Sequence, residues 1–505
     1  MKKLNLKYIG LFIAAAAIVS CETEFENPID EVDVYTSGEA DFSNYVAIGN
    51  SLTSGYADGA LYLDAQTKSF PAIMAGQMEL AGGGEFIQPL VNDNAGGLLA
   101  AGVPIPGFGN RFVLASDGMG SPAGPAVYTG ATPTTDITNT VTGKLNNYGV
   151  PGAKSFHLGA PGYGNIAGLL LGQANPYYVR FASSGTSTVI GDAVAANPSF
   201  FTLWIGNNDI LSFATSGGSG VDQLGNLDPT TYGSNDITDP NVFAGAVNGY
   251  VTALTSNGAK GALINIPNVT SIPFFTTVPS NAIPLDAATA GQVMSNPAIQ
   301  QYNGGLQAAA GAGAITADEA ALRTINFTAG QNFMLMVDED LTDLSGFGLP
   351  NLRQTNDTDL ITFTSASVIG TRADPNDPLS VIGVAVPLGD ENVLTSTEQT
   401  AISDAQNAYN TTLENIAAAN DLVYVDAKAA LAEVAAGGVS FNGGVLSSTY
   451  ASGGAFSLDA VHPTPRGYAF TANVIIDAIN EKYGSTIPKV EIGNYRSVQT
   501  SDLVN

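Results

Sequence analysis

The residues best suited to nucleophilic catalysis begin with a serine near the N-terminal end. Ser51 follows a short apolar run, 46–48, that breaks at Gly49 into a polar turn. This pattern is typical of a buried strand that delivers a side chain to the edge of a sheet. A serine hydroxyl is a weak nucleophile at neutral pH, so it requires a base, a group that orients the base, and donors for an oxyanion. Taken alone, Ser51 is more typical of a turn or a helix cap.

A base and an acid lie together near the C-terminal end. Asp459 precedes His462 by three residues in a proline-bearing loop. This spacing lets the carboxylate bond one ring nitrogen while the other faces a substrate, which fixes the tautomer that a general base needs. The chain has only two histidines. Ser51, Asp459 and His462 are therefore the candidate nucleophile, orienting acid and general base.

Four short motifs resemble the ordered blocks of the SGNH hydrolases, also called the GDSL esterase/lipase family. They are residues 49–52, 147–153, 206–209 and 459–462. Each motif is a weak signal, and four in the right order are a strong one. The resemblance implies a carboxylic ester hydrolase that works through an acyl-serine intermediate, with no metal ion or organic cofactor.

The same resemblance assigns the oxyanion donors: the backbone N–H groups of Ser51 and Gly152, and the side-chain amide of Asn208. Local sequence alone would make the last two ordinary turn residues. Asn50 departs from the family, which usually has aspartate before the nucleophile. The second histidine, His157, has no carboxylate beside it, so we expect it to affect substrate preference at most.

Strands and helices are expected to alternate along the matching segments. Apolar runs predict strands, and helical spacing of apolar residues predicts helices. The expected strands lie at 46–48, 200–205, 261–266 and 422–425, and the expected helices at 70–78, 241–257, 397–420 and 464–484. Alternation implies a parallel sheet covered on both faces. The resemblance implies an α/β fold, a flavodoxin-like three-layer α/β/α sandwich with the active residues at the carboxyl ends of the strands.

The first 41 residues indicate export and attachment. Residues 1–20 place lysines before an apolar stretch too short to span a bilayer comfortably, which predicts a signal peptide. Residues 18–21 resemble a bacterial lipobox, in which Cys21, the only cysteine, carries the lipid; a plain signal peptide with an incidental cysteine is the alternative. Residues 21–41 are acidic with no basic residue, which predicts a flexible tether. We expect an exported lipoprotein anchored at the outer membrane, on either face.

The remaining chain is expected to form one hydrolase domain, 42–484, followed by a C-terminal tail, 485–505. Two insertions interrupt the domain. The first, 83–144, is glycine-rich and predicts an irregular excursion near the active face. The second, 276–395, includes an expected helix near 286–311. It is either a lid over the pocket or a decorative subdomain.

The strongly negative net charge of the chain limits which molecules it can bind. A net charge of −28 argues against binding nucleic acid or anionic lipid headgroups. Two acidic pairs, Asp236/Asp239 and Asp374/Asp377, could bind calcium, although solvated turns explain them better. We expect an ester substrate, either an acyl lipid or an acylated glycan. A carbohydrate O-deacetylase and a non-catalytic glycan- or partner-binding surface lipoprotein remain alternatives, and the sequence leaves the oligomeric state open.

Overall fold

The computed structural model describes residues 35–116 and 122–504. The expected signal peptide and Cys21 lie outside the described residues. Within the described parts, no helix combines the length and apolar character that crossing a bilayer requires.

Five parallel strands form the central sheet. They are β1 (Tyr45–Gly49), β7 (Asn147–Gly149), β8 (Phe200–Trp204), β9 (Lys260–Ile264) and β16 (Val423–Val425). Their spatial order is β7-β1-β8-β9-β16, with every neighbouring pair parallel. All residues of β1 and β8 are buried, as expected where both faces of a sheet are covered. Numbered along the chain, this order is 2-1-3-4-5, which confirms the flavodoxin-like arrangement.

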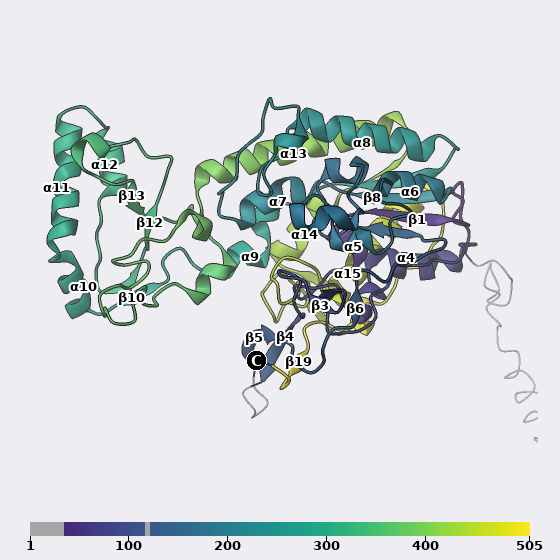
Figure 1. Ribbon diagram of the computed structural model, residues 1–505, viewed down its shortest axis with the longest axis horizontal. Coiled ribbons are helices and arrows are strands. Elements are labelled where there is room, and N and C mark those ends of the chain that lie inside the picture. The colour runs from purple at the N-terminus through teal and green to yellow at the C-terminus, as the bar shows by residue number, and fades with distance from the viewer. Residues whose placement is uncertain (1–34, 117–121, 505) are drawn as a thin grey trace, which may run out of the picture.

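Helices cover both faces of the sheet (Figure 1). On one face lie α4 (Phe70–Glu79) and α15 (Pro465–Tyr483), which pack against each other; on the other lie α6 (Val189–Ala195), α8 (Pro240–Thr255) and α13 (Ser396–Ala419). Several begin with a proline in the first turn, where its missing N–H would have no partner in the helix. The expected three-layer sandwich is confirmed.

Shorter elements lie in the connections. The helices are α2 (Ser51–Ser54), α3 (Leu63–Gln66), α5 (Pro176–Val179), α7 (Asn208–Thr215), α9 (Pro273–Thr276) and α14 (Ala427–Ala436). A hairpin, β17 (Val439–Phe441) and β18 (Gly444–Leu446), follows α14.

The first insertion is more regular than we expected. It contains β2 (Leu98–Ala100), β3 (Val103–Pro104), β4 (Phe112–Ser116), β5 (Pro122–Val127) and β6 (Thr135–Asp136). These strands form two small sheets, β3-β2-β6 and β19-β4-β5. The strand β19 (Thr500–Ser501) comes from the expected tail and pairs in parallel with β4. The C-terminal residues are thus part of the folded body.

The expected flexible tether also ends earlier than Asp41. Thr36 exchanges backbone and side-chain hydrogen bonds with Thr486, and the Glu39 N–H donates to the Tyr483 carbonyl at 2.8 Å. Ala40 is buried. Acidic composition predicted self-repulsion, but it gave no sign of these backbone hydrogen bonds to the end of α15, which fix the segment from Thr36 onward.

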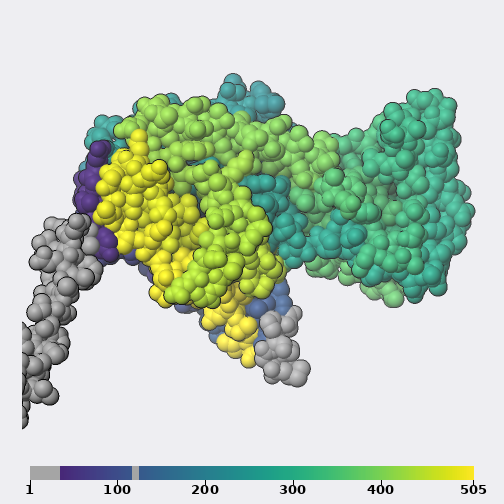
Figure 2. All heavy atoms as spheres, turned by 180° about the vertical axis from the view of Figure 1, so that it is seen from behind, coloured from purple at the N-terminus to yellow at the C-terminus, as the bar shows by residue number. Residues whose placement is uncertain are grey.

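The second insertion, residues 276–395, forms a lobe beside the sheet (Figures 1 and 2). Its strands are β10 (Ile283–Leu285), β11 (Gly330–Asn332), β12 (Leu335–Val337), β13 (Leu352–Gln354), β14 (Leu360–Ile361) and β15 (Val393–Leu394). Its helices are α10 (Ala287–Met294), α11 (Pro297–Gly311) and α12 (Ala317–Arg323). The single helix expected near 286–311 is therefore two, because Asn296 caps a new helix that begins at Pro297. Leu306, Met334 and Ile361 belong to an apolar core of the lobe that is separate from the core around the sheet.

Candidate active site

Ser51 lies where the interior strand β1 ends and α2 begins. Gly49 makes this turn possible, because a Cβ there would lie 2.3 Å from both the Thr53 hydroxyl and the Trp204 carbonyl oxygen. Asn50 caps the helix by accepting the Leu52 N–H at 3.0 Å. Ser51 is thereby held at the carboxyl edge of the sheet as the first residue of a helix, with 6% of its surface exposed.

The three candidate catalytic side chains form one chain of hydrogen bonds. His462 Nε2 lies 2.9 Å from Ser51 Oγ, although the two residues are 411 positions apart in sequence. His462 Nδ1 lies 2.9 Å from Asp459 Oδ2. The ring of Tyr56 packs against the imidazole, with 4.7 Å between ring centroids. This is the geometry in which a base activates a nucleophile and is itself oriented by an acid.

Asp459 is held as a carboxylate by donors on several sides. Its Oδ1 accepts the backbone N–H groups of Val461 and His462 and the Ser457 hydroxyl; its Oδ2 also accepts the Gly59 N–H at 2.9 Å. Burial alone would raise the pKa of Asp459, but His462 and these hydrogen bonds lower it to about 2. The group is therefore ionised throughout the neutral range.

A buried aspartate missed by the sequence interpretation supports the loop that carries Asp459 and His462. Asp58, at φ 54°, donates its N–H to Ser457 Oγ at 2.9 Å and accepts the Leu458 N–H at 3.0 Å. Together with Gly59, it ties the segment after α2 to the loop that carries Asp459. The Asp-Gly pair seven residues after Ser51 was a visible turn signal, but its partner lies 399 positions away.

The structure shows the role of Asn50, which stands where the family usually has aspartate. Its side chain is fully buried, and its amide Nδ2 lies 3.1 Å from Asn207 Oδ1 in the third motif. The amide thus links the loops after β1 and β8 through a neutral hydrogen bond. Asn50 retains an ordering role without the negative charge that aspartate would bring.

The candidate oxyanion donors lie in adjoining loops. The Asn208 amide donates to the Ala153 carbonyl at 2.9 Å, which ties the third motif to the second. Asn208 lines the same cavity as Ser51 and His462. Gly152 is exposed at φ 80° with open space around it, but it is not among the residues that line this cavity.

His157 is in a different environment from His462. Its Nδ1 accepts the Lys154 N–H at 3.0 Å, and its ring stacks on Tyr163. Burial, with a contribution from the positive charge of Lys154, lowers the pKa of His157 to about 4. It does not line the cavity beside Ser51, so the structure gives no contact through which it would select substrates there.

A mostly apolar cavity of about 120 Å³ opens beside Ser51 and His462. Its walls come from the ends of β9, β16 and β18, from α14, and from α15. They include Ile264, Val425, Val434, Leu446, Val474 and Ile475. Among the described residues, none from 276–395 lines this cavity, which counts against the lid interpretation of the lobe.

The carboxylates of the two acidic pairs singled out in the sequence accept hydrogen bonds from backbone N–H groups. Asp239 caps α8 by accepting the Asn241 and Val242 N–H groups, and Asp236 accepts the N–H groups of Val221 and Gly233. Asp374 and Asp377 each accept a backbone N–H two residues further on. These contacts agree with turns and caps.

Comparisons with known proteins agree with the motifs. The chain matches the family described as GDSL-like Lipase/Acylhydrolase over residues 45–475. The comparison with curated proteins found no match. Among solved structures, the acetylxylan esterase Axe2 from Geobacillus stearothermophilus aligns with 10% identity and a TM-score of 0.30, covering 88% of this chain and 96% of that one. An extracellular lipase from Streptomyces rimosus aligns with 12% identity and a TM-score of 0.29, covering 86% of this chain and 99% of that one.

Neither structural likeness is strong enough to indicate a substrate. The family match is decisive because it spans nearly the whole described chain, including all four motifs. The chain therefore belongs to the GDSL-like lipase/acylhydrolase family and is a carboxylic ester hydrolase.

Proposed function

We propose that this hydrolase cleaves esters of medium or long acyl chains. The observation that carries the proposal is the apolar cavity beside Ser51, whose walls include Val434, Leu446 and Ile475. Each buried CH₂ group contributes about 0.8 kcal/mol when it leaves water for apolar surroundings. An acetyl group would leave most such walls uncovered, whereas a longer chain would cover them.

In the proposed mechanism, His462 Nε2 removes the proton from Ser51 Oγ as that oxygen attacks the ester carbonyl. Asp459 orients the imidazole and stabilises the imidazolium that forms. The imidazolium then gives its proton to the departing alkoxide, which leaves an acyl-serine. His462 next deprotonates a water molecule that attacks the acyl-serine; the imidazolium then returns this proton to Ser51 Oγ as the acyl–oxygen bond breaks, which releases the acid and restores the free serine.

The oxyanion would be held by groups at the edge of the sheet. The Ser51 N–H lies in the first turn of α2, where helix N–H groups have no partner within the helix. Asn208 uses one amide hydrogen for the Ala153 carbonyl, which leaves its second for the oxyanion. We assign the Gly152 N–H as the third donor, because its lack of a side chain permits close approach of the substrate.

A chain-length series tests the proposal. With p-nitrophenyl esters from acetate to decanoate, kcat/KM should rise with chain length until the cavity is filled. Ala430→Trp, which narrows the cavity from α14, should lower kcat/KM for decanoate at least about tenfold and change acetate less than about threefold. Ala436→Trp is the matched control, because Ala436 lies exposed on the same helix outside the cavity. A wild-type preference for acetate, unaltered by Ala430→Trp, would instead favour a deacetylase.

We also propose that the protein is exported and held at the outer membrane by lipid on Cys21. The lipobox-like residues 18–21 support this proposal, together with an acidic segment before Thr36. About 14 residues at up to about 3.3 Å each would let the folded body stand clear of the bilayer. Mass spectrometry of the mature N-terminus should detect acylated Cys21. Cys21→Ala should release the protein without changing its rate on a soluble ester, and an unmodified cysteine would contradict the proposal.

A further inference from the structure

Three carboxylates converge where the lobe joins the sheet domain. Glu339 follows β12 and Asp390 begins a short turn of 3-10 helix (Asp390–Asn392), both within the lobe. Glu398 lies in the first turn of α13, outside the lobe. One oxygen from each of the three lies within 4.8 Å of the others. Two of these carboxylates belong to the lobe and the third belongs to the sheet domain. A ligand bound to all three would therefore connect the lobe to the sheet domain.

Glu398 has one carboxylate oxygen engaged and one unused. Its Oε2 accepts the Thr395 N–H at 2.6 Å and the Thr395 hydroxyl at 2.9 Å, which completes the capping box of α13. Its Oε1 has no hydrogen-bond partner within the described part of the chain, although Glu398 is only 7% exposed. A buried carboxylate oxygen without a donor is costly, which is why such groups are usually paired or bound to a metal.

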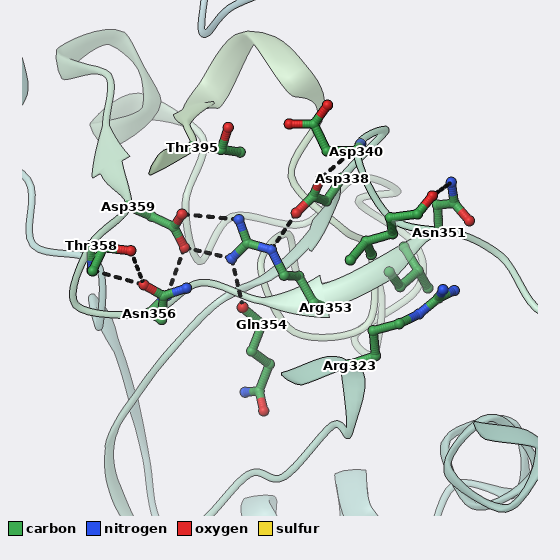
Figure 3. A network of polar contacts seen from close by, with 12 residues as sticks. Arg323, Asp338, Asp340, Asn351, Arg353, Gln354, Asn356, Thr358, Asp359 and Thr395 are labelled. Atoms are coloured by element: carbon green, nitrogen blue, oxygen red, sulfur yellow. Dashed lines mark hydrogen bonds and ion pairs between the residues drawn. The ribbon is translucent and has the colours of Figure 1, made fainter. Parts of the chain in front are cut away.

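The basic side chain that contacts Asp338, the residue before Glu339, is committed elsewhere. The Arg353 guanidinium is paired with Asp338 and makes two hydrogen bonds with Asp359, at 2.6 and 2.9 Å (Figure 3). Among the ion pairs of residues 35–116 and 122–504, none includes Glu339, Asp390 or Glu398. The three carboxylates therefore face one another without an ion-pair partner among the described residues.

The electrostatics agree with this arrangement. Burial raises the pKa of Glu398 to about 8, and the negative charges of Glu339 and Asp390 add to the rise. Burial and the adjacent Glu339 also raise the pKa of Asp390. Burial and the neighbouring negative charges both disfavour the ionised forms of these carboxyl groups, and a bound cation would offset that cost.

We propose that Glu339, Asp390 and Glu398 bind a calcium ion that joins the lobe to the sheet domain. The three ligands are all carboxylates, and hard cations such as calcium prefer oxygen ligands. Zinc sites, in contrast, usually contain histidine or cysteine, and this group has neither. Calcium accepts six to eight oxygens at about 2.3–2.6 Å in irregular geometry, so two of its ligands lie at most about 5 Å apart. The three oxygens all lie within 4.8 Å of one another, inside that limit. Water can complete the shell, because Glu339 is exposed.

This group differs from the acidic pairs Asp236/Asp239 and Asp374/Asp377. The carboxylates of those pairs accept backbone N–H groups from their own turns or helix caps and, for Asp236, also from Val221. The junction group combines residues from separate segments and contains a buried oxygen without a donor. That combination, and not acidity alone, distinguishes it as a metal site.

The test uses the full chain, freed of metals with EDTA and then titrated with CaCl₂ by calorimetry and by thermal unfolding. We expect about one calcium per chain with a Kd on the order of 10⁻⁵–10⁻³ M. At about 100-fold excess over Kd, Tm should rise by a few degrees. A wild-type chain that binds no calcium and shows no shift in Tm would overturn the proposal, as would tighter binding of Mg²⁺ than of Ca²⁺.

Two variants assign the ligands. Glu398→Gln keeps an acceptor for the capping box of α13 but removes the charge, and Glu339→Gln changes an exposed position with little risk to folding. Both should lose calcium binding and the calcium-dependent shift in Tm. Asp340→Asn is the matched control, because it removes the same charge next to Glu339 from outside the group, and it should respond as the wild type does. Calcium binding that is unchanged in both glutamine variants would contradict the assignment.

Discussion

The sheet domain and the lobe use buried polar side chains in different ways. In the sheet domain, Ser51, His462 and Asp459 form a hydrogen-bonded chain that ends at a cavity, so the proposed nucleophile can meet a substrate. In the lobe, Arg353 is enclosed by Asp338 and Asp359, and all three are at least nine-tenths buried. The first arrangement leaves a reactive group available, whereas the second satisfies its charges internally.

This difference indicates that the proposed catalytic residues belong to the sheet domain and that the lobe can change without affecting them. The lobe has its own apolar core, and its residues do not appear among those that line the cavity beside Ser51. Catalysis and lobe stability should therefore respond to different substitutions. The predictions below test that separation, beginning with the largest expected effect.

Removing either end of the Ser51–His462 hydrogen bond should nearly abolish turnover. Ser51→Ala and His462→Ala should each lower kcat on a soluble ester on the order of 10⁴-fold or more, and the double variant should be little worse because the pair acts as a unit. Thermal unfolding should show that the lobe and the sheet domain remain folded. A near-normal rate in Ser51→Ala would refute the assignment of the nucleophile.

The lobe's largest vulnerability is its buried guanidinium. Arg353→Ala leaves Asp338 and Asp359 buried without their cation, which should cost about 3–5 kcal/mol in the free energy of unfolding of the lobe. Urea unfolding and limited proteolysis would measure the loss, and the rate on p-nitrophenyl acetate should be retained. Arg372→Ala is the control, because Arg372 is exposed in the same lobe. Loss of esterase activity with unaltered lobe stability would contradict the separation of the two regions.

The sheet domain was easier to predict from the sequence than the lobe, because its sequence patterns are local. Strands such as β1 and β8 were predictable because continuous apolar runs end at glycine. The candidate catalytic residues could be located because they lie in short motifs that occur in the order of the family. The lobe lacked such signals. Pairing of Arg353 with Asp338 depends on the register between β12 and β13, in which Met336 faces Arg353, and no local pattern specifies that register.

Contacts between distant segments account for most of the other differences. The hydrogen bond from Asn50 to Asn207 joins two loops 157 positions apart. The sequence therefore showed that Asn50 replaces the aspartate usual in the family, but it did not show the hydrogen bond that gives Asn50 its role. Thr36 and the residues around β19 looked like ends of the chain. Their partners, Thr486 and β4, are far from them in sequence, and backbone hydrogen bonds of this kind carry no residue-type signature.

The stability of the catalytic loop should depend on pH through Asp459. Its pKa is lowered from 3.8 to about 2 in the folded state, so the carboxylate stabilises the fold by about 2 kcal/mol above the unfolded-state pKa. That contribution should fall as the pH drops below about 4 and vanish as it passes through about 2. Unfolding free energies of the wild type and Asp459→Asn, compared from pH 5 downward, would measure it. A difference between the two that stays constant with pH would contradict the lowered pKa.

Removing the lobe should have the smallest effect on esterase activity, and it is the most direct test of whether the lobe and the sheet domain act separately. Most of residues 276–395 would be replaced by a short Gly/Ser loop, with folding checked by circular dichroism. Since none of the lobe residues that the structure describes lines the cavity, kcat/KM for acetate and for decanoate esters should each change less than about threefold, a barrier difference below about 1 kcal/mol. The calcium-dependent shift in Tm should disappear in the same variant, because Glu339 and Asp390 are removed with the lobe. A selective loss on decanoate would instead mean that the lobe closes over the cavity during turnover, and the lobe would then share the catalytic task that we propose for the sheet domain alone.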